Sequence, residues 1–291
     1  MEAGVRPLPK MDYASPSSLK ETLDLLRRYK DKARLLSGGT DLIPKMKKRM
    51  VKAQVIIDLN RVPGLSGIKL QKDGIHIGAL TRLAEIKESR LVREKAPVLA
   101  QAIGVMASPP IRNRGTMAGN LSTASPAADT APALLVLEAS VRLQSAKGKR
   151  LIPIQEFFKG PQKTVRGADE ILTEVIIPVR KGRSAFLKLG RRKAFTLSVA
   201  SVAAFARVKG GRFEDLRVAL GAVAPTPIRS RKVEEALKGK EVSEQNIAAA
   251  AELVKGEVKP ISDLRASEEY RREMSAVLTR RVLGQVNGRE R

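Results

Sequence analysis

Two loops of small residues hold the groups best suited to chemistry in this sequence. Consecutive backbone N–H groups can surround a phosphate closely where no Cβ obstructs the approach. The first loop also lies just before a predicted helix, whose N-terminal end favours negative charge. Both loops are therefore candidates for holding a phosphate-bearing ligand. Their sequences are Leu36-Ser37-Gly38-Gly39-Thr40-Asp41-Leu42 and Ile111-Arg112-Asn113-Arg114-Gly115-Thr116-Met117-Ala118-Gly119-Asn120-Leu121.

A purely structural role is the alternative. A lone diglycine turn is more often structural than functional, and the first loop lacks the G-x-G-x-x-G spacing of a Rossmann turn, so a nicotinamide site is not indicated there. Metal chemistry is also disfavoured, because the chain has no cysteine and a single histidine, His76. It cannot ligate an iron–sulfur cluster or a zinc ribbon through cysteine. His76 lies in a predicted hairpin strand and is assigned a structural role.

The predicted elements place the first loop between a strand and a helix. A strand over residues 33–36 runs into the loop, and Asp41 is the expected N-cap of the helix that follows, with Pro44 in its first turn. The second loop is expected to be irregular from 108 to 119, because it is rich in proline and glycine. Between the loops the pattern predicts a buried strand at 55–59, a hairpin at 67–78 turning at Asp73-Gly74, and helices at 81–89 and 96–104.

A change of pattern near residue 180 predicts two domains. Upstream, Asp129 is the expected N-cap of an apolar helix at 132–139, and strands follow at 140–144 and 171–177. Residues 178–183 combine proline, glycine and charge, as linkers do. We therefore expect domains at 1–178 and 183–291. The second is expected to contain strands at 184–189, 198–208 and 216–221, and a last helix at 268–285 capped by Ser267.

The net charge of +25 would attract any polyanion. However, lysine and arginine are spread along the chain, and with 3% aromatic residues it has few platforms for stacking bases. The densest basic run, from Lys45 to Lys52, is interpreted as the solvated face of a helix whose inner face carries Met46 and Met50. Nucleic-acid binding is the less favoured interpretation. The chain also lacks an apolar stretch of about 18 residues and an apolar signal-peptide core, which predicts a cytoplasmic protein without a transmembrane segment.

Taken in order, the two loops resemble those of the medium, flavin-binding subunits of the molybdenum hydroxylases, the family of xanthine dehydrogenase and aerobic carbon monoxide dehydrogenase. The string from Ile111 to Asp129 is similar to that family's flavin signature, and the first loop is similar to its other pyrophosphate loop. The likeness continues into residues 169–172, 188–192 and 269–272, so it covers nearly the whole chain.

The resemblance implies that FAD is the cofactor and that the two loops hold its pyrophosphate. It also implies that Asp129 accepts a hydrogen bond from a sugar hydroxyl, and that Leu172 and Lys188 contact the flavin, with Met106 and Ala107 nearby. Without the resemblance, Asp129 is a helix cap, Leu172 a buried strand residue and Lys188 a solvated charge. The loop residues implied to bind the cofactor are Leu36, Ser37, Gly38, Gly39, Thr40, Asp41, Leu42, Thr116, Met117, Ala118, Gly119, Asn120 and Thr123.

Three positions depart from the family pattern. Pro110 stands where glutamine is common, which removes an amide and a backbone donor. Ala118 replaces a usual glycine, so its methyl group would be costly if this position needed positive φ or touched phosphate. Thr196 lies where many relatives carry aspartate, which makes the contacts of residues 188–197 with the flavin edge the least supported part of the resemblance.

The fold implied is α/β (α+β): a p-cresol methylhydroxylase-type FAD-binding domain in two subdomains, followed by a smaller C-terminal α+β domain. The implied function is electron relay from two [2Fe–2S] clusters on a small subunit to an external acceptor, with the molybdenum cofactor on a large subunit, in a dimer of heterotrimers. The absence of cysteine fits this division and argues against the 4-hydroxybenzoyl-CoA reductase branch, whose medium subunit carries an additional cluster. The alternative is a basic protein that binds nucleic acid or another polyanion without a cofactor.

Overall fold

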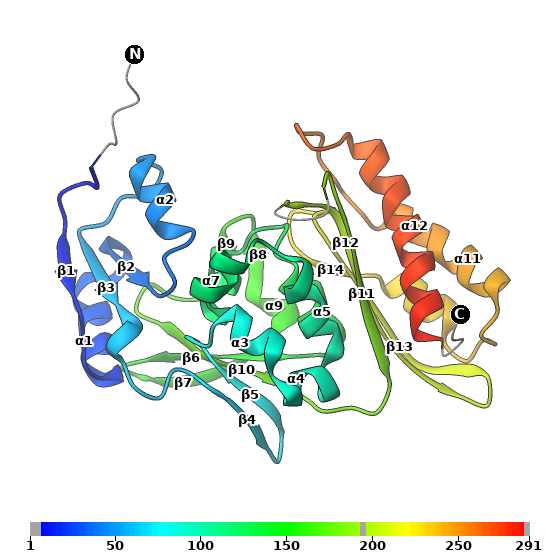
Figure 1. The fold of residues 1–291 in the computed structure, drawn as a ribbon, viewed down its shortest axis with the longest axis horizontal. Helices are drawn as coiled ribbons and strands as arrows, with labels where there is room; N and C mark the ends of the chain where they lie inside the picture. Colours follow the sequence, from blue (N-terminus) through cyan, green and yellow to red (C-terminus); the bar gives the residue numbers. More distant parts are fainter. Residues whose placement is uncertain (1–6, 193–195, 288–291) are drawn as a thin grey trace.

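The computed structural model describes residues 7–192 and 196–287. Three sheets, each accompanied by helices, follow one another across the molecule from the N-terminal lobe to the C-terminal helices (Figure 1). Within the described part of the chain, no helix is long and apolar enough to cross a membrane. The architecture is a mixed α/β one, as predicted.

The N-terminal lobe is built on a three-stranded parallel sheet in the order β1-β3-β2. Helix α1 is amphipathic, and its buried Leu23 and Leu26 pack with Ile57 of the sheet in one apolar cluster. The first loop leaves the sheet where β2 ends and leads into α2. The elements are β1 (Asp12–Ala14), α1 (Leu19–Tyr29), η1 (Lys30–Lys32), β2 (Ala33–Leu36), α2 (Leu42–Lys47), β3 (Val55–Asp58) and η2 (Leu59–Arg61).

The central unit is a five-stranded antiparallel sheet in the order β4-β5-β10-β6-β7. Ile75 pairs with Ile177 and Ile77 with Val175 across β5 and β10, and all four side chains are buried in the largest apolar cluster. The strands are β4 (Ile68–Gln71), β5 (Gly74–Gly78), β6 (Ser140–Ser145), β7 (Gly148–Pro153) and β10 (Ile171–Ile177), with a small hairpin of β8 (Phe158–Gly160) and β9 (Lys163–Thr164). The helices are α3 (Leu83–Glu88), α4 (Arg90–Lys95), α5 (Pro97–Val105), α6 (Pro109–Arg114), α7 (Met117–Thr123), α8 (Thr130–Val136) and α9 (Ile154–Phe157).

The C-terminal sheet, β11-β12-β13-β14, is covered by helices on both faces. Val202 and Ala204 point into the apolar cluster shared with α12, whereas Ala203 and Phe205 point into the cluster shared with α5 and α8, because successive strand residues face opposite sides. The sheet therefore joins the two halves of the molecule (Figure 1). The elements are β11 (Arg183–Gly190), β12 (Ser198–Lys209), β13 (Arg212–Gly221), β14 (Ile228–Arg229), α10 (Arg231–Leu237), α11 (Glu244–Glu252), η3 (Leu253–Gly256) and α12 (Glu268–Val286).

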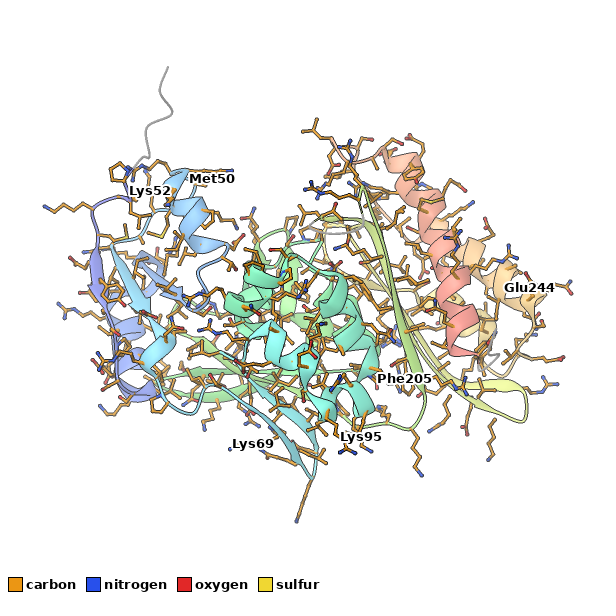
Figure 2. All side chains as sticks on the ribbon, in the orientation of Figure 1. Met50, Lys52, Lys69, Lys95, Phe205 and Glu244 are labelled. Atoms are coloured by element: carbon orange, nitrogen blue, oxygen red, sulfur yellow. The ribbon has the colours of Figure 1, made fainter. Side chains whose placement is uncertain are left out.

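Several predicted elements are confirmed and two expectations are wrong. The strand predicted at 171–177 matches β10, and the hairpin at 67–78 is formed by β4 and β5. The stretch 108–119 is not irregular: Pro109 and Pro110 occupy the first turn of α6, where proline has no N–H to lose, and α7 follows. Helix α2 ends at Lys47, so Met50 is not on an inner helix face; its side chain is 65% exposed at the edge of the lobe (Figure 2).

Candidate functional site

A cavity of about 1200 Å³ lies where the N-terminal lobe, the central helices and the C-terminal sheet meet. We define its N-terminal end by Arg34, residues 37–42 and Arg166, and its C-terminal end by Asp129, Lys188, Arg191, Thr196 and Arg265. All of the predicted cofactor-binding residues line this cavity except two. Leu36 stays within strand β2, and the Met117 side chain is fully buried in the central core.

The two loops contact each other directly, and glycine permits this contact. A Cβ on Gly38 would lie 2.1 Å from the carbonyl oxygen of Arg114, and one on Gly119 would lie 3.1 Å from Ser37 Oγ. The Thr116 hydroxyl donates to Ser37 Oγ at 3.1 Å, which links the loops by a hydrogen bond. The loops therefore form one unit although 79 residues separate the two hydroxyls in sequence.

Two residues without any recognisable motif stabilise this junction. Arg82 donates to the carbonyl of Arg114 at 2.6 Å and to Asn60 Oδ1 at 3.2 Å. The amide of Asn60 in turn donates to the Ser37 carbonyl at 3.0 Å. Neither residue was predicted from the sequence, because an isolated asparagine and arginine give no signal before the chain folds.

At the second loop, the first N–H groups of α7 are already used within the protein. The Met117 N–H donates to the Thr81 carbonyl at 3.1 Å. The Ala118 N–H donates to the Ala79 carbonyl at 3.0 Å, and the Gly119 N–H donates to the threonine hydroxyl that caps the helix. Ala118 has helical backbone angles and not positive φ, so its methyl group carries no backbone strain.

In the first loop, by contrast, several backbone N–H groups are not used within the described part of the protein. Within the described part of the chain, the N–H groups of residues 38–41 have no hydrogen-bond acceptor. Gly39 has φ +73°, a left-handed conformation that favours glycine and turns the chain into α2. These residues are half-buried or exposed at the cavity, and such a run of successive N–H donors suits an anionic ligand because it forms a concavity of positive partial charge.

Asp41 and Asp129 do not cap their helices as expected. Neither side chain hydrogen-bonds the first turn of the helix behind it. Asp41 forms an ion pair with Lys45 at 2.9 Å and accepts a hydrogen bond from Thr123 at 3.3 Å. In each case a cation and a hydroxyl outcompete the backbone N–H groups as partners.

Asp129 instead joins the two halves of the molecule at the C-terminal end of the cavity. It is 3% exposed and accepts from Lys188 Nζ at 2.7 Å and from the Ser198 hydroxyl. Burial raises the pKa of Asp129, while Lys188 and Ser198 oppose that rise. Lys188 also donates to the Thr196 carbonyl at 2.9 Å, so it is a buried, paired cation and not the solvated charge of the alternative interpretation.

The remaining predicted residues form an apolar wall. Leu172 is buried in β10 beside a register shift against β6. Ala107 has φ +49°, and the Arg112 guanidinium fixes this segment by donating to the carbonyl of Met106 at 2.6 Å. Arg112 lies in the second loop of the sequence analysis, but no role was assigned to it.

Arginines are the main lining residues that the sequence analysis missed. Arg34, Arg166 and Arg191 line the cavity, and none has a carboxylate within ion-pair distance among the described residues. Arg34 and Arg166 both line the N-terminal end, and burial lowers the pKa of Arg166, an effect that Glu170 opposes and Arg34 increases. Such unpaired cations indicate an anionic ligand.

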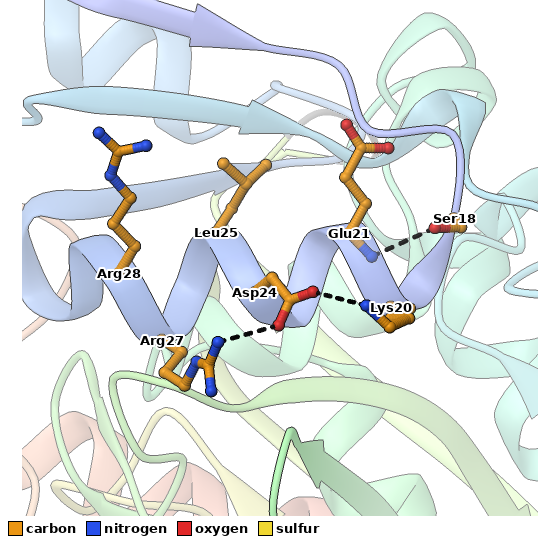
Figure 3. Close-up of a pocket in the computed structure, with 7 residues that line it drawn as sticks. All are labelled: Ser18, Lys20, Glu21, Asp24, Leu25, Arg27 and Arg28. Carbon is orange, nitrogen blue, oxygen red and sulfur yellow. Dashed lines mark hydrogen bonds and ion pairs between the residues drawn. The ribbon is translucent and has the colours of Figure 1, made fainter.

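A smaller hollow of about 690 Å³ lies along α1, far from the loops. Its lining side chains all come from this helix and its cap, and Asp24 pairs with Lys20 at 3.1 Å and with Arg27 at 3.4 Å (Figure 3). Because a single helix face cannot enclose a ligand, this hollow is a solvated surface.

His76, which was expected to have a structural role, contacts two carboxylates on the central sheet. Its ring lies between Asp73 and Glu174, each 2.8 Å away, and it is not among the residues that line the cavity.

Two family models cover most of the chain. Residues 9–180 match the FAD binding domain in molybdopterin dehydrogenase, and residues 185–286 match the CO dehydrogenase flavoprotein C-terminal domain.

Curated relatives match over nearly their full length. The chain is 36% identical to the glyceraldehyde dehydrogenase medium chain of Sulfolobus acidocaldarius, covering 96% of this chain and 99% of that one. It is 32% identical to the xanthine dehydrogenase FAD-binding subunit of Escherichia coli O157:H7, covering 94% of each chain. A chain of carbon monoxide dehydrogenase from Hydrogenophaga pseudoflava, in a structure that lacks the Mo-pyranopterin moiety of the molybdenum cofactor, superposes with a TM-score of 0.93 at 32% identity, covering 96% of this chain and 98% of that one.

Proposed function

We propose that this chain, which belongs to the family of FAD-binding domains of molybdopterin dehydrogenases, relays electrons through a bound FAD from partner subunits to an external acceptor. The observation that supports this most directly is the cavity with a run of free N–H donors at one end and a buried ion pair at the other. FAD is long and amphipathic, with an anionic pyrophosphate and an apolar ring system, so it requires both kinds of lining.

The N-terminal end fits the pyrophosphate. The N–H groups of residues 38–41 would donate to its oxygens, and the hydroxyls of Ser37, Thr40 and Thr116 lie beside them. Arg34 and Arg166 would neutralise its charge. The second loop contributes mainly by shaping the first, since its own N–H groups at 117–119 are used.

The C-terminal end fits the sugar hydroxyls and the ring. Asp129 has a second lone pair on each oxygen and could accept from a ligand hydroxyl while it stays paired with Lys188. Leu172, Met106 and Ala107 supply apolar surface for the ring. When bound, the flavin supplies two-electron redox chemistry, and the residues of this chain bind it, orient it and exclude water.

The partners follow from the same proposal. Relatives are named as medium chains and subunits, which supports an assembly with further subunits. In this proposal a small subunit carries [2Fe–2S] clusters, a large subunit carries the molybdenum cofactor, and the three form a dimer of heterotrimers. We also propose a domain boundary between residues 178 and 183, supported by separate sheets on either side and by family models that meet there.

A pair of glycine substitutions tests FAD binding. Gly39 and Gly64 have nearly the same left-handed backbone, at φ +73° and +77°, but only Gly39 lies in the cavity. Valine at either site adds strain of at least about 1–2 kcal/mol. We expect Gly64→Val to purify with FAD and Gly39→Val to lose most of it, as measured by visible flavin absorbance and by the released cofactor, with circular dichroism as the control for folding.

Equal FAD content in both variants would contradict the assignment of the first loop. A colourless wild-type protein with salt-dependent affinity for DNA would instead support the polyanion-binding alternative.

A further inference from the structure

The cationic groups of the cavity exceed what one FAD requires. Lys45 and Lys188 are neutralised by Asp41 and Asp129 at 2.9 and 2.7 Å. The pyrophosphate of FAD carries about two negative charges, and the N-terminal end already offers Arg34 and Arg166 for it. At the C-terminal end Arg265 is paired with Asp263, and Arg191 is left without a carboxylate partner among the described residues.

These arginines are held in place by a rigid turn. Arg191 Nη1 donates to the Leu264 carbonyl at 2.9 Å, and Arg265 forms an ion pair with Asp263. Asp263 also accepts from the buried guanidinium of Arg271 at 2.8 Å, and the two surrounding arginines hold its pKa far below the usual range. The turn is therefore fixed before any ligand arrives.

The guanidinium of Arg191 has further N–H donors with which it can bind a ligand. The bond to Leu264 uses one of the five N–H donors of its guanidinium, and among the described residues no carboxylate lies within ion-pair distance of it. Asp263 carries one negative charge against the two of Arg265 and Arg271, so this corner keeps a net positive charge. The corner lines the cavity on the C-terminal domain, whereas Arg34 and the first loop belong to the N-terminal lobe on the far side of α7 (Figure 1).

From this separation we propose that Arg191 and Arg265 form a second anion-binding site at the C-terminal end of the cavity, which takes an anionic small-molecule electron acceptor. The inference rests on the proposed function, because the acceptor would share the cavity with the flavin. Carboxylate or phosphate groups on the acceptor would pair with the two guanidiniums, and guanidinium geometry favours such planar or tetrahedral anions.

Ferrocyanide is a suitable probe, because it is a compact anion that does not oxidise or reduce the resting protein. We expect it to bind the full FAD-loaded chain with a salt-dependent affinity in isothermal titration calorimetry. Arg191→Gln should weaken this binding about tenfold, as the loss of one charge-assisted hydrogen bond would. Arg191→Lys should restore part of it. The matched control is Arg90→Gln on α4, whose side chain is 87% exposed, and it should change nothing.

Reoxidation of the dithionite-reduced protein gives a second readout. Each reduced flavin consumes two ferricyanide ions, which gain one electron each, and its protons pass to solvent. Arg191→Gln should slow reoxidation by ferricyanide but not by the cationic dye methylene blue. Equal slowing with both oxidants, or unchanged ferrocyanide affinity in an FAD-loaded variant, would overturn this site alone. A wild-type chain that binds no FAD would overturn the proposed function as well.

Discussion

The two ends of the cavity differ in their polar groups, which are backbone N–H groups at one end and side chains at the other. At the N-terminal end the donors are backbone N–H groups of residues 38–41, which are free among the described residues. At the C-terminal end the side chains of Asp129 and Lys188 are paired with each other, and Ser198 donates a further hydrogen bond to Asp129. The first arrangement gains hydrogen bonds when a ligand binds, whereas the second gains them when the two domains fold together.

This difference predicts different consequences of mutation. Changes at the N-terminal end should affect FAD more than the fold, and changes at the Asp129–Lys188 pair should affect the fold first.

Lys188→Met should be the most damaging. It leaves the Asp129 carboxylate buried without its cation, and breaking a buried pair from one side costs about 3–5 kcal/mol. The loss should appear as a lower free energy of unfolding in urea. The double variant that also carries Asp129→Asn should recover much of it, because no unpaired charge then remains. A double variant as unstable as the single one would show that Lys188 acts by packing alone.

The pH dependence of Lys188→Met follows from the same burial. The pKa of Asp129 is already raised in the wild type, and losing Lys188 removes a group that opposes the rise. A carboxyl whose pKa is raised on folding contributes stability below its unfolded pKa and loses that contribution as pH rises through the folded pKa. The deficit of the variant relative to wild type should therefore shrink as the pH is lowered from 8 toward about 5, and a constant deficit would argue against charge as the cause.

Gly38→Ala tests the junction of the loops. The added Cβ would lie 2.1 Å from the Arg114 carbonyl oxygen, which is backbone and cannot easily move. Overpacking of this kind costs about 1–3 kcal/mol, and FAD content should fall with it because the first loop would shift. Gly284→Ala is the control, since its Cβ meets nothing within 4 Å and alanine favours the helix. Unchanged melting temperature and FAD content in Gly38→Ala would mean that the loops do not meet so closely.

The sequence predicted those parts of the site that depend on local chemistry. The glycines of the first loop and the strand before it were identifiable because small residues and apolar runs have local meaning. The strand at 171–177 was similarly clear from its apolar composition. The fold class followed from the resemblance, and the structure confirms it.

The missed features depend on contacts between distant parts of the chain. Asp129 was expected to cap its own helix, but Lys188, 59 residues away, provides a stronger partner once the C-terminal sheet docks. Arg82 and Asn60 support the loops through bonds that no spacing rule reveals. Met50 was misplaced because the basic run continued the helical pattern beyond Lys47, where the helix ends.

Ala118→Gly should have the smallest effect, and it separates the roles of the two loops. Ala118 lies in the first turn of α7, its N–H donates to the Ala79 carbonyl at 3.0 Å, and its backbone does not have positive φ. Restoring the glycine that is usual in the family should therefore lower the free energy of unfolding by about 0.5–1 kcal/mol through lost helix propensity. It should leave the dissociation constant of FAD unchanged. Ala249→Gly on the exposed face of α11 is the control for helix propensity alone, and it should lose no more stability than Ala118→Gly, whose methyl group is also buried. A variant that binds FAD more tightly would show that the methyl group crowds the pyrophosphate, so that the second loop touches the ligand directly. A variant that binds FAD more weakly while Ala249→Gly does not would show that the second loop is built around alanine to hold the cofactor. Either result would remove the distinction between the first loop, which binds FAD, and the second loop, which only supports the first.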